Sequence, residues 1–179
     1  MFVQAELESI LADKELYYLP EYSVITVYDD NFFVRNDYDI LSRGQRNYLI
    51  TFFKTFGFKQ SSGKVMSKNE LKINFPKPKH TLALSAYQAN FNQPAENELY
   101  AVTPSTFAEV LFYDALSKGK DWGLQQLQQL INTCPYNIEL IRDINYRSPI
   151  EQITIATFKT LTEHQNTVVV DKFKFKKAL

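Results

Sequence analysis

The sequence has 179 residues, and its 20 Lys and Arg are balanced by 20 Asp and Glu, so the formal net charge is zero. Hydrophobic residues make up 45% of the chain, which is enough for a packed core and excludes a disordered or fibrous protein. A chain of this length is typical of one domain. We therefore expect residues 1–179 to form a single domain.

The composition also bears on location. No apolar run approaches the roughly 18 residues of a membrane span, and residues 1–15 hold acids where a secretory signal has a basic start. The single cysteine, Cys134, excludes an intrachain disulfide. We expect a cytoplasmic protein that does not contact a membrane, with Cys134 as a buried or half-buried thiol.

The first predicted elements are a helix and a hairpin. In residues 2–13 the apolar positions recur at helical spacing, which predicts a short amphipathic helix. Residues 23–28 are rich in β-branched side chains and are followed by Asp-Asp-Asn, a turn sequence. We expect them to form a hairpin with residues 32–34.

A second helix is predicted from Ser42 to Phe56. Ser42 and Gln45 have the spacing of a capping box, in which each side chain bonds the backbone N–H of the other residue. Gly57 is suited to the left-handed conformation that ends a helix. This helix is the long basic amphipathic element of the fold.

Three further strands are predicted before residue 103. Residues 68–75 alternate apolar and polar side chains, which is typical of a half-exposed strand with Lys68, Glu70 and Lys72 on its polar face. Residues 81–87 and 99–102 are the other two.

Four helices are expected next, because four positions combine a capping residue with a following apolar stripe. These starts are Thr103-Pro104, Asp121, Asn137 and Ser148-Pro149. The residues from 167 to 175 favour a closing strand.

The fold class is therefore α+β with a mostly antiparallel sheet. It contains an N-terminal helix, the basic helix, a run of four short helices and a final C-terminal strand. Residues 1–102 are mainly sheet plus two helices, residues 103–163 are helical and residues 167–175 close the sheet.

Recognised catalytic motifs are missing. The two histidines, His80 and His164, lack a second ligand at metal spacing, and no phosphate-binding glycine loop occurs. We predict no cofactor, no metal and no catalytic residue.

One acidic pattern supports a remote alternative. Glu70-Leu71-Lys72, with Asp29 and Asp30 on an earlier turn, resembles the (D/E)xK element of Mg²⁺-dependent nucleases, in which the acids hold the metal. Chance alone gives about two such triplets in a chain of this composition. The nuclease interpretation is therefore weak.

The zero net charge conceals two opposed segments. Residues 1–40 hold nine acids and two bases, whereas residues 41–80 hold nine bases and one acid. Projection of the basic helix places Arg43, Arg46, Asn47 and Lys54 within about 100° of one another. With Lys68 and Lys72 these four residues are our candidate polyanion-binding site.

Two functions from different classes fit this charge layout. The first is a non-enzymatic accessory protein that binds a polyanion, in particular the phosphate backbone of DNA or RNA. The second is a protein-interaction module of the inhibitor, adaptor or chaperone type, which binds an acidic protein or forms a homodimer. The acids of residues 1–40 could instead neutralise the bases within the fold.

Overall fold

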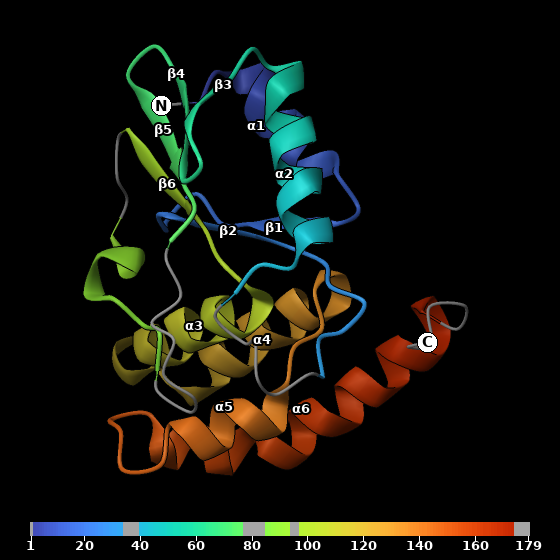
Figure 1. Cartoon of the computed structure of the whole chain (residues 1–179). Coiled ribbons are helices and arrows are strands. Elements are labelled where there is room, and N and C mark those ends of the chain that lie inside the picture. Colours follow the sequence, from blue (N-terminus) through green and yellow to red (C-terminus); the bar gives the residue numbers. More distant parts are fainter. Residues whose placement is uncertain (1, 34–39, 77–84, 94–96, 174–179) are drawn as a thin grey trace.

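The structure, a computed structural model, describes residues 2–33, 40–76, 85–93 and 97–173. In these residues it has six α-helices, one short 3₁₀ helix and a six-stranded mixed sheet (Figure 1). The strands are β1 (Leu16–Tyr18), β2 (Val24–Val27), β3 (Lys59–Ser62), β4 (Val65–Lys68), β5 (Leu71–Asn74) and β6 (Glu98–Ala101). The helices are α1 (Gln4–Ala12), α2 (Arg43–Thr55), η1 (Ala89–Asn92), α3 (Pro104–Lys118), α4 (Lys120–Thr133), α5 (Ile138–Ile144) and α6 (Glu151–Lys172).

The sheet has the strand order β1-β2-β6-β5-β4-β3. β6 lies in its centre and runs parallel to both β2 and β5, while the other three pairs are antiparallel. The predicted mostly antiparallel sheet therefore differs from the mixed sheet of the structure. The difference arises because the long connection from β5 to β6 is a crossover, which parallel neighbours require.

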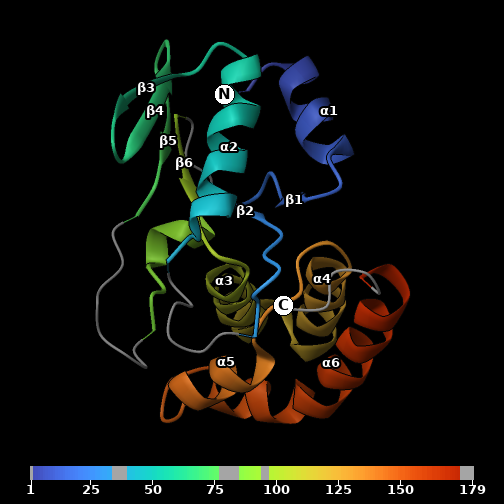
Figure 2. The ribbon, with the colours of Figure 1, turned by 45° about the vertical axis from the view of Figure 1, so that its right-hand side comes forward.

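Helices lie on both sides of this sheet, and on one side α3 and α4 contact it mainly at β2 and β1 (Figures 1 and 2). The cross-strand partners Ile73 and Leu99 share the face on which α1 and α2 pack, with Leu49 and Phe53 of α2 in the same core cluster. The opposite face, which includes Val24, belongs to the core cluster with α3 to α6. We call these the α2 side and the α3 side of the sheet.

The predicted start and end of the basic helix are confirmed. The Ser42 hydroxyl accepts from the Gln45 N–H at 3.1 Å, and the Gln45 side chain accepts from the Ser42 N–H at 2.9 Å. Gln45 also donates to the Val27 carbonyl at 2.9 Å, which ties the first turn of α2 to β2. Gly57 has φ 84°. Local capping therefore positions this helix as the sequence indicates.

The N-terminal helix is also confirmed, but its buried face differs from the apolar stripe. Glu6 and Ile10 are buried, whereas Val3 and Leu11 are 59% and 57% exposed. A buried carboxylate in place of an apolar side chain requires a partner, and that partner is Lys68 of β4.

The predicted hairpin of residues 23–28 with 32–34 is wrong. β2 pairs instead with the preceding strand, with Leu16 opposite Val27, and on its other side with β6. Phe32 and Phe33 lie in a turn, where the Phe32 N–H donates to the Asp29 carbonyl at 3.3 Å; residue 34 is outside the described residues. All four residues of β2 are buried, so this strand has neighbours on both edges and both faces.

The predicted closing strand at residues 167–175 is also wrong, because α6 continues through Lys172. Leu161 and Val168, seven residues apart, are both buried and so lie on one helical face. Packing of this face overrides the β-propensity of the three consecutive valines. Residues 174 and 175 are outside the described residues.

Two of the other helical starts agree with the prediction. Thr103 caps α3 by accepting from the Thr106 N–H at 3.2 Å, and Asn137 caps α5 by accepting from the Leu140 N–H at 3.0 Å. The other two predicted caps are wrong. Gly119 is the N-cap of α4, so Asp121 lies in its first turn, and α6 begins at Glu151 with Ile150 as its N-cap rather than at Ser148-Pro149. The strand expected at residues 81–87 falls mostly outside the described residues, and residues 85–87 are not a strand. None of the helices described is long and apolar enough to cross a membrane.

Candidate functional site

The outward face of α2 presents a straight row of polar side chains. Arg43, Asn47 and Lys54 are exposed, and we call them the α2 row. Leu49 and Phe53 on the inward face are fully buried. At 1.5 Å per residue, Arg43 and Lys54 are about 16 Å apart along the helix axis. The core therefore holds the two cations at a set separation.

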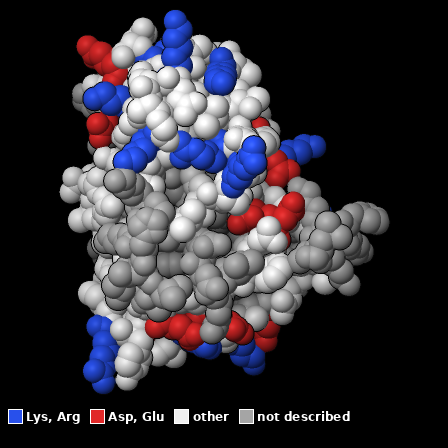
Figure 3. All heavy atoms as spheres, viewed as in Figure 1, with Lys and Arg blue, Asp and Glu red and all other residues white. Residues whose placement is uncertain are grey.

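No acidic side chain in the described part of the chain forms an ion pair with Arg43 or Lys54. Figure 3 shows Lys and Arg side chains in a band across the half of the molecule that contains α2 and β3 to β5, with Asp and Glu at its margins. The α2 row thus has cationic groups available to an external anion.

Arg46 lies at the edge of the row and is engaged within the fold. It is half-buried, its guanidinium lies 4.4 Å above the centre of the Phe75 ring, and it donates a hydrogen bond to the Gly63 carbonyl. These contacts anchor the loop between β3 and β4 to α2. Arg46 adds charge beside the α2 row, but its side chain is directed towards the sheet.

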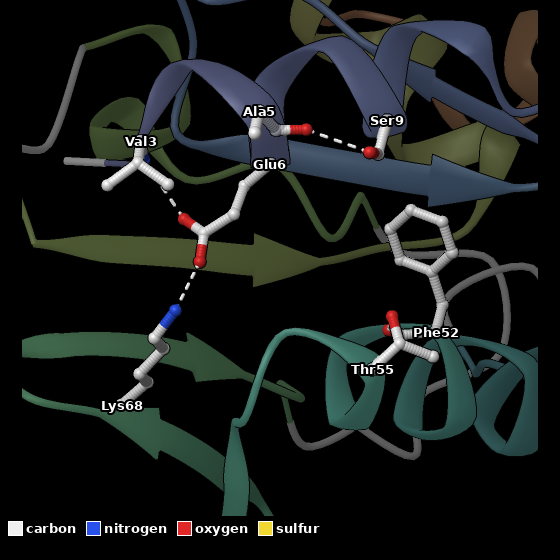
Figure 4. Close-up of polar contacts among 7 residues, drawn as sticks. All are labelled: Val3, Ala5, Glu6, Ser9, Phe52, Thr55 and Lys68. Atoms are coloured by element: carbon white, nitrogen blue, oxygen red, sulfur yellow. Dashed lines mark hydrogen bonds and ion pairs between the residues drawn. The ribbon is translucent and has the colours of Figure 1, made fainter.

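Lys68 is placed on the α2 side of the sheet, where it forms an ion pair with Glu6 of α1 (Figure 4). The Glu6 side chain is only 5% exposed and that of Lys68 is 32% exposed. The other carboxylate oxygen of Glu6 accepts from the Val3 N–H at 2.9 Å. The amine of Lys68 therefore neutralises a buried carboxylate and joins α1 to β4.

Replacing Lys68 with methionine is expected to lower the free energy of unfolding by about 1 kcal/mol, since it leaves the Glu6 carboxylate without its cation. Urea denaturation of Lys68→Met measures this loss. The double variant Glu6→Gln with Lys68→Met should recover part of it, because no unpaired charge remains. An unchanged midpoint in Lys68→Met would contradict this structural role.

Lys72 lies on the other side of the sheet from Lys68, so the expectation of one shared polar face is wrong. A two-residue turn at Asn69 and Glu70 separates β4 from β5, with Asn69 at φ 53°. Cross-strand partners share a face. Lys68 pairs with Leu71, whereas Lys72 pairs with Ser67.

Lys72 instead belongs to a second pair of cations. Ser67 is the cross-strand partner of both Lys59 and Lys72, so all three point to the α3 side. Both lysines are exposed. We call Lys59 and Lys72 the sheet-face lysines. The sheet itself separates them from the α2 row, so the two sets cannot contact one flat surface together.

Acids of residues 1–40 lie around two tyrosines, Tyr48 of α2 and Tyr28 directly after β2, and not on the row. Tyr48 donates to the two carboxylate oxygens of Asp13 at 2.8 and 3.0 Å. Burial, then this hydrogen bond and the charge of Asp13, raise the pKa of Tyr48 well above its usual value. Burial and then the charge of Asp30 raise the pKa of Tyr28 in the same direction, with Glu15 and Asp29 contributing. These four acids are the acidic patch: Asp13, Glu15, Asp29 and Asp30.

Among the described residues, the acids of residues 1–40 neutralise the bases of residues 41–80 only in part. Glu6 neutralises Lys68, and Asp13 engages Tyr48, which lies on the flank of α2. Arg43 and Lys54 keep no such partner among the described residues. Asp37 and Asp39, the acids just before the helix, are outside the described residues.

The described residues that the sequence suggests for metal binding or catalysis do not come together in one site. Glu70 is exposed in the turn between β4 and β5, and the described residues contain no group of three or more His, Cys, Asp or Glu that could hold a metal ion. His164 contacts the Asn132 side chain at 3.0 Å, and His80 is outside the described residues. Cys134 is fully buried, as predicted, and burial raises the pKa of its thiol.

Sequence reasoning missed two features of this surface. The Glu6–Lys68 pair joins residues 62 positions apart, and no local pattern indicates it. The separation of Lys72 from Lys68 follows from the turn at Asn69-Glu70, for which the presence of an Asn was the only available signal.

Comparison with known proteins adds no relative: no family model, no curated protein and no solved structure matches this chain.

Proposed function

We propose that this protein is a non-enzymatic binding protein that holds a polyanion, in particular the phosphate backbone of a nucleic acid, on the α2 row. The observation that supports the proposal most directly is the exposure of Arg43 and Lys54 without an acidic partner among the described residues. Exposed cations that keep their charge for an external ligand are what backbone binding requires.

The α2 row, with Arg46 at its side, replaces the six-residue site expected from the sequence. Lys68 neutralises Glu6, and Lys72 faces the other side of the sheet. With two exposed cations in contact, binding would be modest and strongly dependent on salt. The slope of log affinity against log salt is expected near −1.8 for a duplex, at about −0.9 for each phosphate neutralised.

Charge reversal of the row is the first test of the proposal. Arg43→Glu with Lys54→Glu is expected to raise the Kd for fluorescein-labelled DNA at least about tenfold at low salt. The matched control is Lys59→Glu with Lys72→Glu, which makes the same change in net charge at the exposed sheet-face lysines. Fluorescence anisotropy at two salt concentrations measures both, and circular dichroism checks that both are folded.

The control variant distinguishes binding at the α2 row from a general effect of the net charge of the protein. If the two double variants weaken binding equally, only net charge matters and the α2 row is not the site. If neither single-stranded nor duplex DNA binds the native chain at low salt, the proposal is wrong.

A second candidate function rests on the acidic patch formed by Asp13, Glu15, Asp29 and Asp30. A homodimer in which the α2 row of each copy meets the acidic patch of the other would be isologous and electrostatically complementary. Light scattering would then detect a dimer at low salt that dissociates at high salt, and the Arg43→Glu with Lys54→Glu variant would be a monomer. A native chain that is monomeric at low salt excludes this arrangement.

A further inference from the structure

We infer that the polyanion is double-stranded nucleic acid, bound along its backbone without stacking of bases on aromatic side chains. This inference rests on the proposed function and narrows it to one class of ligand. The single-stranded form is the competing ligand, since proteins that bind it combine cations with aromatic platforms.

The aromatic side chains of α2 are not available as such a platform. Phe53 is fully buried. Phe52 is half-buried, with its ring centre 5.4 Å from that of Phe53 and 5.2 Å from that of Phe56, both edge-on. These rings pack against one another and the core, and at about 100° per residue Phe52 and Phe56 project to the side of α2 opposite the α2 row.

Tyr48 is the exposed aromatic residue of α2, and its surroundings oppose a nucleotide. Its hydroxyl is held by both oxygens of the Asp13 carboxylate, and Glu15 adds a second negative charge nearby. A base stacked on this ring would bring its phosphate close to these two acids. Like charges at short distance repel, most strongly at the low salt where binding is tightest.

The other exposed aromatic residues of the described chain lie away from the row. The Phe33 carbonyl accepts from the Asn137 side chain at the start of α5, and Tyr146 lies two residues after the end of α5. Both therefore adjoin α5, which belongs to the core cluster on the α3 side of the sheet. No stacking surface adjoins the α2 row in the part of the chain that the structure describes.

The fixed spacing of Arg43 and Lys54 favours a ligand that is stiff and carries closely spaced negative charges. Arg43 and Lys54 are held about 16 Å apart on a capped helix, and duplex DNA presents one negative charge per roughly 1.7 Å of its axis. A duplex meets both cations without being ordered first, whereas a flexible single strand must lose conformational freedom. Asn47 and Thr51, exposed between the cations, add hydrogen-bonding groups without charge.

Anisotropy titrations with a 20-base-pair duplex and with oligothymidylate of the same length test the inference. We expect the duplex to bind several-fold more tightly, with a salt slope near −1.8 against about −1.4 for the single strand. Two duplexes of unrelated sequence should bind within about twofold of each other, because phosphate contacts carry no base information.

Tyr48→Ala is the variant that distinguishes backbone contact from stacking. It should leave duplex binding unchanged within about twofold, whereas loss of a stacked base costs about 1–3 kcal/mol, or roughly 5–150-fold. Equal or tighter binding of oligothymidylate, or a loss of binding in Tyr48→Ala, overturns the inference while leaving a polyanion site in place. Absence of binding to both ligands overturns the proposed function itself.

Discussion

Replacing Phe53 with alanine is expected to lower the free energy of unfolding by about 3–5 kcal/mol. Phe53 is fully buried, and its ring centre lies 5.5 Å from that of Phe58 and 6.1 Å from that of Phe2. One side chain thus joins α2 to Phe2, which precedes α1, and to Phe58, which precedes β3. Its removal leaves a cavity that these three elements cannot close without moving.

Guanidinium denaturation followed by circular dichroism measures this loss, and Thr51→Ala serves as the control. Thr51 is exposed on the same helix, so its replacement should change stability by no more than about 0.5 kcal/mol. A loss below about 1 kcal/mol in Phe53→Ala would contradict the packing described for the α2 side of the sheet. Since the whole domain is stable by about 5–15 kcal/mol, the variant should remain measurable at low temperature.

Gly123→Ala is expected to destabilise the protein by about 1–3 kcal/mol, although alanine is the better helix former. A Cβ at position 123 of α4 would lie 2.5 Å from the Cβ of Ala115 in α3, which is closer than two non-bonded carbon atoms can approach. The two helices must separate to admit it. Glycine at this position is therefore needed for close packing of α3 on α4.

A double-variant cycle separates this steric effect from helix propensity. Ala115→Gly removes the clashing carbon, so Gly123→Ala with Ala115→Gly should recover much of the stability lost in Gly123→Ala. Gly44→Ala in α2 is the second comparison, because its new Cβ would meet only the Ser42 hydroxyl oxygen, at an ordinary 3.7 Å. Thermal unfolding that shows Gly123→Ala to be neutral would exclude the proposed close contact.

The local elements of this fold follow closely from the sequence. The capping box at Ser42 and Gln45, and the caps at Thr103 and Asn137, form as their residue types predict. Each of these signals lies within one helical turn of the residue it positions. The exposed face of α2 is predicted for the same reason, since helical periodicity alone places Arg43, Asn47 and Lys54 together.

The failures concern contacts between distant segments. The sequence predicts that β2 pairs with the residues that follow it. In the structure β2 lies between β1 and β6, and all four of its residues are buried. The valines at 168–170 favour a strand by propensity, but packing against α4 and α5 retains them in α6. In both cases apolar burial between distant segments outweighs a local preference of at most about 1 kcal/mol per residue.

The sequence by itself determined that the chain has an N-terminal helix, a basic amphipathic helix with a cationic outer face, and a helical C-terminal half. Tertiary structure alone decided which cations remain available to a ligand. Lys68 is neutralised by Glu6, Lys72 is turned to the opposite side of the sheet, and the α2 row is left exposed. The physical reason is that helix periodicity acts over one or two turns, whereas ion pairing and strand register depend on partners brought together only by folding.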